Sequence, residues 1–201
     1  MDALKSDAPL IIYIDVKSPY ALVAIGPTLK LAQRYGLAIG WRAYSMAERD
    51  IPDSGANRAV IESHRVARAR SRRAIDQKYA RLRGMTLTFP ENKGPCDLAL
   101  GALTEISGDR LPFIRAAMAA CWEEHRDLDD PVVVADILAQ CRVECSDDLG
   151  SARGAFAATQ AAALDAGIVE APAFVIDGQL FIGRQHLPWI EEIARAKVAA
   201  S

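Results

Sequence analysis

The feature that most constrains the fold is that strand-like sequence occurs only near the two ends of the chain. Apolar runs or alternations of strand length cover 9–15, 37–42, 173–176 and 179–182. Short runs rich in β-branched residues indicate strands, and a continuous run indicates a strand buried on both faces. Between 56 and 167 the apolar residues instead follow helical periodicity. One small sheet must therefore be built from opposite ends of the sequence.

The first two expected strands flank a helix and predict a βαβ unit. Ser18 before Pro19 suits a helix start, because serine caps helices and proline fits the first turn. Gly36 suits the helix end, while Gly26-Pro27 threatens the helix with a kink. Strand, helix and strand at this spacing predict two parallel strands joined by a right-handed crossover.

The C-terminal part predicts a hairpin followed by a helix. Asp177-Gly178 between two short β segments is a strong hairpin signal, and Leu187–Lys197 has helical amphipathicity. The order is βαβ, four or five helices, then ββα, with a proline just before the third strand. This order predicts an α/β protein with a thioredoxin-like fold. We expect residues 9–55 and 168–199 to form that domain and 56–167 to form a large inserted all-helical subdomain.

Composition supports one helix-rich globular domain with an insertion. The 201 residues include 36 alanines, which favour helices, and aromatic residues make up 6 %, few for an all-β sandwich. The net charge of −2 argues against a dedicated nucleic-acid binder. No window approaches the ~18 apolar residues of a membrane span, and the start lacks signal-peptide features. We expect a cytoplasmic protein that binds neither membrane nor nucleic acid.

Charge is distributed unevenly along the chain. Residues 57–83 hold nine Lys/Arg and two acids, net +7, whereas residues 123–148 hold nine acids and two arginines, net −7. Two solvated helical faces that attract each other, within the protein or across a dimer, explain both blocks. The basic block also suits attraction of an anionic substrate. Nucleic-acid binding has the least support, because no aromatic platform accompanies the arginines.

The cysteines show no sign of a redox or metal centre. No C-x-x-C pair occurs among Cys96, Cys121, Cys141 and Cys145, and without an export signal we expect no disulfides. The three histidines are scattered, so no metal site is expected. We predict four buried, unreactive thiols.

Three segments carry a resemblance to a known family. Residues 13–20, YIDVKSPY, resemble the Y-x-D-x-x-S-P-Y/F opening of 2-hydroxychromene-2-carboxylate isomerases and the related kappa-class glutathione transferases of the DsbA-like group. Residues 79–80 with 87–90 resemble the weaker W-A … P-L-x-F-P segment. Residues 167–183 are similar to G-V-x-G-V/A-P-T-F-x-V-D-G-E-x-F-x-G. The resemblance runs from about Leu10 to Ile193 and implies a thioredoxin fold with a helical insertion.

Ser18 is the candidate catalytic residue. It stands where thioredoxin-like oxidoreductases carry their attacking cysteine, and with no cysteine nearby we expect no disulfide exchange. A hydroxyl at a helix N-terminus can donate a hydrogen bond to an anion. The resemblance implies that this anion is the glutathione thiolate, whose pKa the hydroxyl would lower. The alternative is that Ser18 only caps the helix.

The resemblance also implies a cofactor site around Ser18. Ala171-Pro172 matches the family's cis-proline, whose preceding residue pairs with the glutathione backbone; the alternative is an ordinary strand-edge proline. Lys17 stands where the family has an apolar residue, and its ammonium either helps to ionise a thiol or points to solvent. Asn57, in a loose match to a G-N motif, is a further candidate contact.

The clearest departure from the family lies at 183–187, where G-x-D-R-L/F is usual. In the family a Ser/Asn-Asp pair there holds the ammonium and carboxylate of the γ-glutamyl group. Gln185 replaces the acid, which weakens the contact by ~1 kcal/mol or more, and His186 replaces the arginine. We expect Arg184, Gln185 and His186 to contact the cofactor, although His186 also suits a surface position without a role.

The leading hypothesis is a glutathione-dependent isomerase that acts on a 2-hydroxychromene-2-carboxylate-like aromatic catabolite, with a homodimer as the expected assembly. By resemblance, the thiolate adds to a conjugated ring-opened intermediate, a carbon–carbon bond rotates, and elimination regenerates glutathione. The expected substrate-binding residues are Tyr20, Phe89, Pro90 and Asn92. The alternatives are kappa-like glutathione transfer and a thioredoxin-fold binding protein without catalysis, which Gln185 favours.

Overall fold

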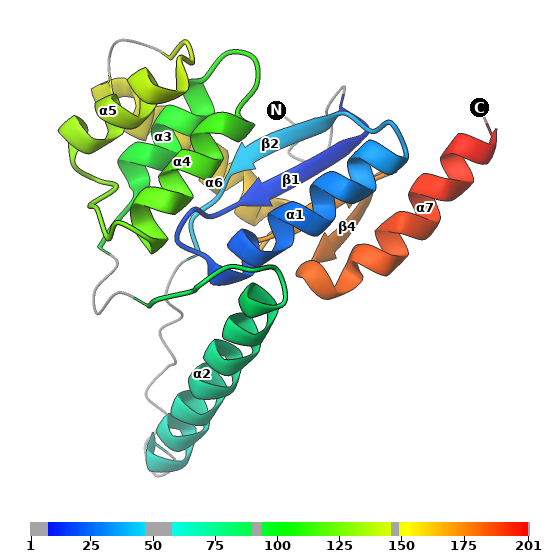
Figure 1. Cartoon of the computed structure of the whole chain (residues 1–201), viewed down its shortest axis with the longest axis horizontal. Helices are drawn as coiled ribbons and strands as arrows, with labels where there is room; N and C mark the ends of the chain where they lie inside the picture. Colours follow the sequence, from blue (N-terminus) through cyan, green and yellow to red (C-terminus); the bar gives the residue numbers. More distant parts are fainter. Residues whose placement is uncertain (1–7, 47–57, 90–93, 146–148, 201) are drawn as a thin grey trace. The chain divides into compact units, whose positions relative to one another are not determined.

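A four-stranded mixed sheet forms the centre of the larger part of the molecule (Figure 1). The computed structural model describes residues 8–46, 58–89, 94–145 and 149–200. The chain forms two compact units, one of residues 1–46 and 89–201 and one of residues 47–88.

The sheet joins strands from both ends of the sequence in the order β2-β1-β3-β4. Its strands are β1 (Leu10–Ile14), β2 (Ile39–Ala43), β3 (Ala173–Ile176) and β4 (Gln179–Ile182). β1 pairs in parallel with β2 and antiparallel with β3, and β3 pairs antiparallel with β4. The predicted parallel pair and the predicted hairpin are therefore confirmed.

Helices cover both faces of the sheet, as the continuous apolar sequence of β1 predicts. Alternate residues of β1 and β3, including Ile11 and Val175, pack in one cluster with Ala163 of α6 (Leu149–Asp165). The intervening residues, such as Ile12, point to the other face, in front of which α1 (Pro19–Arg34) crosses in Figure 1. Every residue of β1 is buried as a result.

α1 begins and ends where the sequence predicts. Ser18 is its N-cap and Pro19 its first residue, and the helix continues without interruption through Pro27. Gly36 follows its end with a φ of +62°, a conformation that glycine adopts without strain. Glu191 links this end to α7 (Leu187–Ala200), since its Oε1 accepts hydrogen bonds from the Arg34 guanidinium at 2.6 Å and from the Tyr35 hydroxyl at 3.0 Å.

The remaining helices of the larger unit pack beside the sheet (Figure 1). They are α3 (Asp97–Glu105), α4 (Leu111–Trp122) and α5 (Pro131–Cys141). α3 is almost wholly buried between Leu98 and Leu103, and its main partner is α6. Within the described ranges, no helix is long and apolar enough to cross a membrane.

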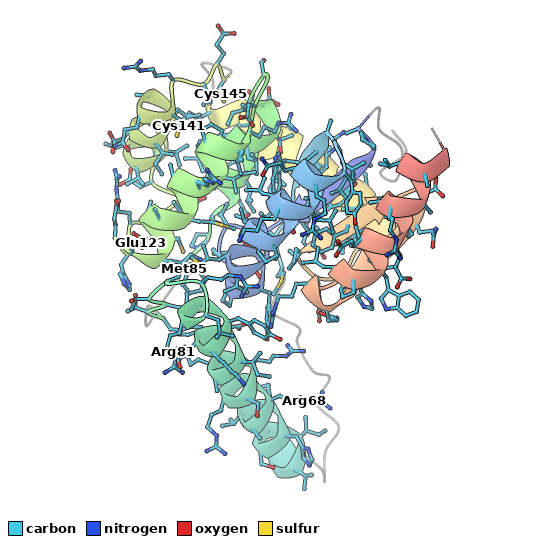
Figure 2. The ribbon with its side chains drawn as sticks, turned by 45° about the vertical axis from the view of Figure 1, so that its right-hand side comes forward. Arg68, Arg81, Met85, Glu123, Cys141 and Cys145 are labelled. Atoms are coloured by element: carbon cyan, nitrogen blue, oxygen red, sulfur yellow. The ribbon has the colours of Figure 1, made fainter. Side chains whose placement is uncertain are left out.

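The smaller unit contains α2 (Arg58–Arg81). Its side chains at 60 and 62–75 are exposed, and Arg68 and Arg81 extend outward from the helix in Figure 2. Arg65 and Glu62 form an ion pair at 3.0 Å within the helix. The predicted insertion, 56–167, includes α2 and also α3 to α6 of the larger unit, so its definition as one subdomain stays a prediction.

The contact between α3 and α6 predicts a sharp difference between two glycine-to-alanine substitutions. A Cβ on Gly101 would lie 2.6 Å from the backbone oxygen of Ala152, which cannot move as a side chain can. Gly101→Ala should destabilise the protein by about 1–3 kcal/mol. Gly154→Ala, on the exposed side of α6 with open space around it, should stabilise by about 0.5–1 kcal/mol. Urea unfolding measures both, and equal effects would contradict the packing.

Candidate functional site

The turn between β1 and α1 holds Ser18 by backbone hydrogen bonds. The Ser18 amide donates to the Asp15 carbonyl at 3.0 Å, and the Leu22 amide donates to the Ser18 carbonyl at 3.0 Å. The Ala21 amide donates to Ser18 Oγ at 3.3 Å, which confirms the predicted helix cap. Ser18 is only 1 % exposed, so the cap is formed in the interior.

The Ser18 hydroxyl also connects the two halves of the sheet. Its Oγ donates to the Ala171 carbonyl at 3.1 Å, across 153 positions of sequence. The Ala171–Pro172 peptide bond is cis, as the resemblance implies. The Gly183 amide donates to the Pro172 carbonyl at 2.8 Å, so the segment after β4 joins the same end of the sheet. Ser18, Ala171, Pro172 and the 183–186 segment therefore come together.

Arg184, Gln185 and His186 form a short 3₁₀ helix, η2 (Arg184–His186), next to this junction. Gln185 is exposed, but its Nε2 donates to the Ile182 carbonyl at 3.1 Å, so the side-chain amide folds back on its own strand. The half-buried His186 ring lies 6.0 Å from that of Phe181. Roles for all three residues in binding a cofactor stay predictions.

A buried carboxylate that the sequence pattern did not indicate lies beneath the turn. Asp15 follows β1 and is 2 % exposed; its Oδ1 accepts from the Lys17 amide at 2.8 Å and its Oδ2 from the Met46 amide at 2.9 Å. The Cys96 thiol lies 4.0 Å from the same Oδ1. The sequence feature that could have indicated it is an acidic residue directly after a fully apolar strand. A charged group at such a buried position is tolerated only where specific hydrogen-bond partners compensate for the loss of water.

Solved structures with this arrangement of strands and helices match almost the whole chain. A 2-hydroxychromene-2-carboxylate isomerase matches with a TM-score of 0.68 and 20 % identity, over 96 % of this chain and 98 % of that one. A probable DsbA oxidoreductase from Streptomyces coelicolor matches with a TM-score of 0.69 and 13 % identity, over 96 % and 90 %. The chain has a DsbA-like thioredoxin fold.

A third similar structure contains a ligand. The cytosolic disulfide reductase DsbM from Pseudomonas aeruginosa, solved with GSH, matches with a TM-score of 0.52 and 14 % identity, over 95 % of this chain and 98 % of that one. No protein-family model matches the sequence, and no curated protein does. These similarities establish the thioredoxin fold.

Lys17 and an aromatic pair lie beside the Ser18 turn of this thioredoxin fold. The half-buried Lys17 directs its Nζ to the Gly94 carbonyl at 3.1 Å. The Trp122 indole donates to the Val16 carbonyl at 3.1 Å, and Phe89 meets Trp122 edge-on with ring centroids 5.7 Å apart. The structure therefore brings Phe89 near the turn through Trp122, a residue that the sequence analysis did not place in the site.

The other predicted substrate and cofactor contacts have different outcomes. Tyr20 lies in the first turn of α1, and its hydroxyl oxygen is buried. Asn57, Pro90 and Asn92 lie outside the described residues. Their roles remain predictions that follow from the resemblance alone.

The cysteines divide into two pairs by burial. Cys96 and Cys121 are buried, whereas Cys141 and Cys145, labelled near the end of α5 in Figure 2, are half-buried. The prediction of buried thiols is therefore right for the first pair and wrong for the second, because the chain leaves α5 at Arg142 in a left-handed conformation near the surface. Within the described ranges no cluster of potential ligands could hold a metal ion.

Burial should decide which thiols react. Burial, followed by the nearby Asp15 carboxylate, holds the pKa of Cys96 well above its usual value, while Lys17 opposes this shift. Iodoacetamide should therefore modify Cys141 and Cys145 before Cys96 and Cys121 in the folded protein. Peptide mass spectrometry measures the order, and the urea-unfolded protein, where all four thiols should react alike, is the control. Early modification of Cys96 would contradict the described packing.

Proposed function

We propose that the chain is a glutathione-dependent isomerase that acts on a 2-hydroxychromene-2-carboxylate-like aromatic catabolite. The observation that carries the proposal is the Ser18 hydroxyl, which caps α1 and faces the carbonyl before the cis-proline. Serine replaces a redox cysteine here, which favours stabilisation of a thiolate over disulfide exchange. Similarity to the isomerase supports the reaction type, and the GSH in the DsbM structure supports the cofactor class.

Ser18 acts in this proposal by redirecting one hydrogen bond. Its hydroxyl now donates to the neutral Ala171 carbonyl, and rotation about the side chain would aim the same proton at a thiolate. A hydrogen bond to an anion is stronger than one to a neutral carbonyl. The Ala21 amide continues to donate to Oγ, which polarises the hydroxyl further. The positive end of the α1 dipole adds to the stabilisation of negative charge.

The residues around Ser18 fit glutathione with one weak point. The Lys17 ammonium supplies positive charge beside the turn, and Arg184 and His186 offer donors for a carboxylate on the adjacent segment. Gln185 is the weak point, because a neutral amide replaces an acid opposite the γ-glutamyl ammonium. Bound glutathione would supply a thiol nucleophile that adds reversibly to a conjugated double bond, which allows a carbon–carbon bond to rotate.

The substrate in this proposal is an aromatic carboxylate. The edge-on pair of Phe89 and Trp122 beside the turn supports an aromatic ligand, and Lys17 supplies a counter-charge for a carboxylate. Tyr20, Pro90 and Asn92 complete the proposed substrate contacts, and Asn57 the proposed cofactor contacts. A homodimer in the cytoplasm is the expected assembly and location.

Two observations favour a second candidate, a thioredoxin-fold protein that binds a ligand without catalysis. Ser18 is almost fully buried and already makes both a donor and an acceptor bond. The Gln185 amide is bound to its own strand. Kappa-like glutathione transfer would use the same site as the isomerase, and only assays with substrates separate those two activities.

Binding of glutathione and its ionisation by Ser18 form the first test. Millimolar glutathione should raise the thermal unfolding temperature, because a ligand stabilises the state it binds. Ser18→Ala should raise the pKa of the bound thiol by about 1 to 2, since a hydrogen bond to a charged group contributes about 1.5–3 kcal/mol. An ultraviolet thiolate titration measures this pKa, with Ser107→Ala, an exposed serine, as control. An unchanged pKa would remove the role assigned to Ser18.

Substitution of Gln185 tests the placement of the γ-glutamyl ammonium. Gln185→Asp should tighten glutathione binding about fivefold or more, because a charge-assisted hydrogen bond replaces a neutral one. Gln179→Asp, at the other end of β4, makes the same change in net charge and should leave affinity unchanged. Isothermal titration calorimetry measures both. Equal affinities for the wild type and both variants would place the ammonium elsewhere.

A further inference from the structure

We propose that the buried Asp15 carboxylate is a positioning residue, which fixes the turn that carries Ser18 by tying it to the end of β2 and the start of α3. The inference rests on the proposed function insofar as Ser18 acts on a thiolate. Asp15 touches neither substrate nor cofactor in this role and acts through Ser18.

Three segments of the larger unit meet at the Asp15 side chain. Oδ1 accepts from the Lys17 amide inside the turn, one residue before Ser18. Oδ2 accepts from the Met46 amide, three residues beyond the end of β2. The thiol of Cys96, the N-cap of α3, lies 4.0 Å from Oδ1. The Ser18 amide also donates a hydrogen bond to the Asp15 carbonyl. Together, these contacts restrain the turn at Asp15, where it begins, and at Ser18, where it ends.

The contacts suit an ionised carboxylate. Each oxygen accepts a hydrogen bond from a backbone amide nitrogen 2.8–2.9 Å away, a pattern that uses both oxygens as acceptors. A charge that is 2 % exposed is costly unless its hydrogen bonds compensate for lost water. The presence of a buried carboxylate beneath Ser18 despite this cost indicates that the turn needs its hydrogen bonds to keep its geometry. An apolar residue of similar size could not make these bonds.

Placement of the Ser18 hydroxyl by Asp15 and the electric field of the Asp15 charge have opposite effects on the pKa of a thiol at this site. The negative charge of Asp15 alone disfavours a nearby thiolate, as it does for Cys96, where Asp15 raises the pKa and Lys17 lowers it. The other groups acting on Cys96 are Asp97 and Cys121. A well-placed Ser18 hydroxyl instead favours the thiolate. When Asp15 loses its charge, the direction in which the pKa of the bound thiol changes therefore shows whether Asp15 acts by positioning Ser18 or through its electric field.

Asp15→Asn is the decisive variant, because it keeps the size of the side chain and removes an acceptor. One of its atoms becomes an NH₂ donor that faces an amide donor, either that of Lys17 or that of Met46. The turn should loosen, glutathione should bind about tenfold more weakly, and the pKa of its bound thiol should rise as in Ser18→Ala. Asp177→Asn, at the exposed β3–β4 turn, is the matched control and should change neither quantity.

The pKa of the bound thiol in Asp15→Asn distinguishes three roles for Asp15. A raised pKa of the bound thiol supports positioning. A lowered pKa means that Asp15 acts through its field alone, and an unchanged pKa means that it serves stability only; either result overturns the proposal.

Hydrogen exchange on the wild-type protein tests the same idea without glutathione. The Lys17 and Met46 amides lie outside every helix and strand, yet their bonds to Asp15 should slow exchange at least about tenfold against a free amide. Rapid exchange at both would overturn the proposal even if Asp15→Asn does not fold. If the wild type shows protection but binds no glutathione, the proposed function fails while the restraint of the turn by Asp15 stands.

Discussion

Antiparallel pairing of β1 with β3 is the interaction on which the rest of the structure depends. It aligns Leu10–Tyr13 with residues 173–176, near the opposite end of the chain. The same pairing brings the C-terminal end of β1 and the N-terminal end of β3 to the same end of the sheet. Only there can the Ser18 hydroxyl reach the Ala171 carbonyl, so the candidate site is a direct consequence of strand register. A slip of one residue would reverse every buried side chain of β1.

The chemistry available at this end of the sheet is set by a few groups with opposing charge. The hydroxyl of Ser18 and the start of α1 favour an anion, and the Lys17 ammonium adds to this preference. The Asp15 carboxylate opposes it but restrains the turn. In the proposed function, a thiolate site here would balance precise placement of the Ser18 hydroxyl against the negative charge of Asp15, whereas a redox thioredoxin fold relies on the reactivity of its own cysteine.

Much of this site was predictable because it depends on local rules. The cap at Ser18, the parallel β1–β2 pair and the hairpin at Asp177-Gly178 follow from short motifs, whereas the cis bond before Pro172 was implied only by the family resemblance. The burial of Asp15 beneath the turn, the contact of Trp122 with the turn and the partial exposure of Cys141 were not predictable. Their roles depend on what packs against them from distant segments, and no local pattern records that.

The sequence by itself determined the element order and the absence of a redox cysteine at the start of α1. It did so because apolar periodicity and residue identity are local properties. Only the tertiary structure decided that Asp15 is buried beneath the Ser18 turn and that the Gln185 amide bonds to Ile182. Burial and side-chain partners arise from packing between segments far apart in sequence, and their energies depend on the whole arrangement.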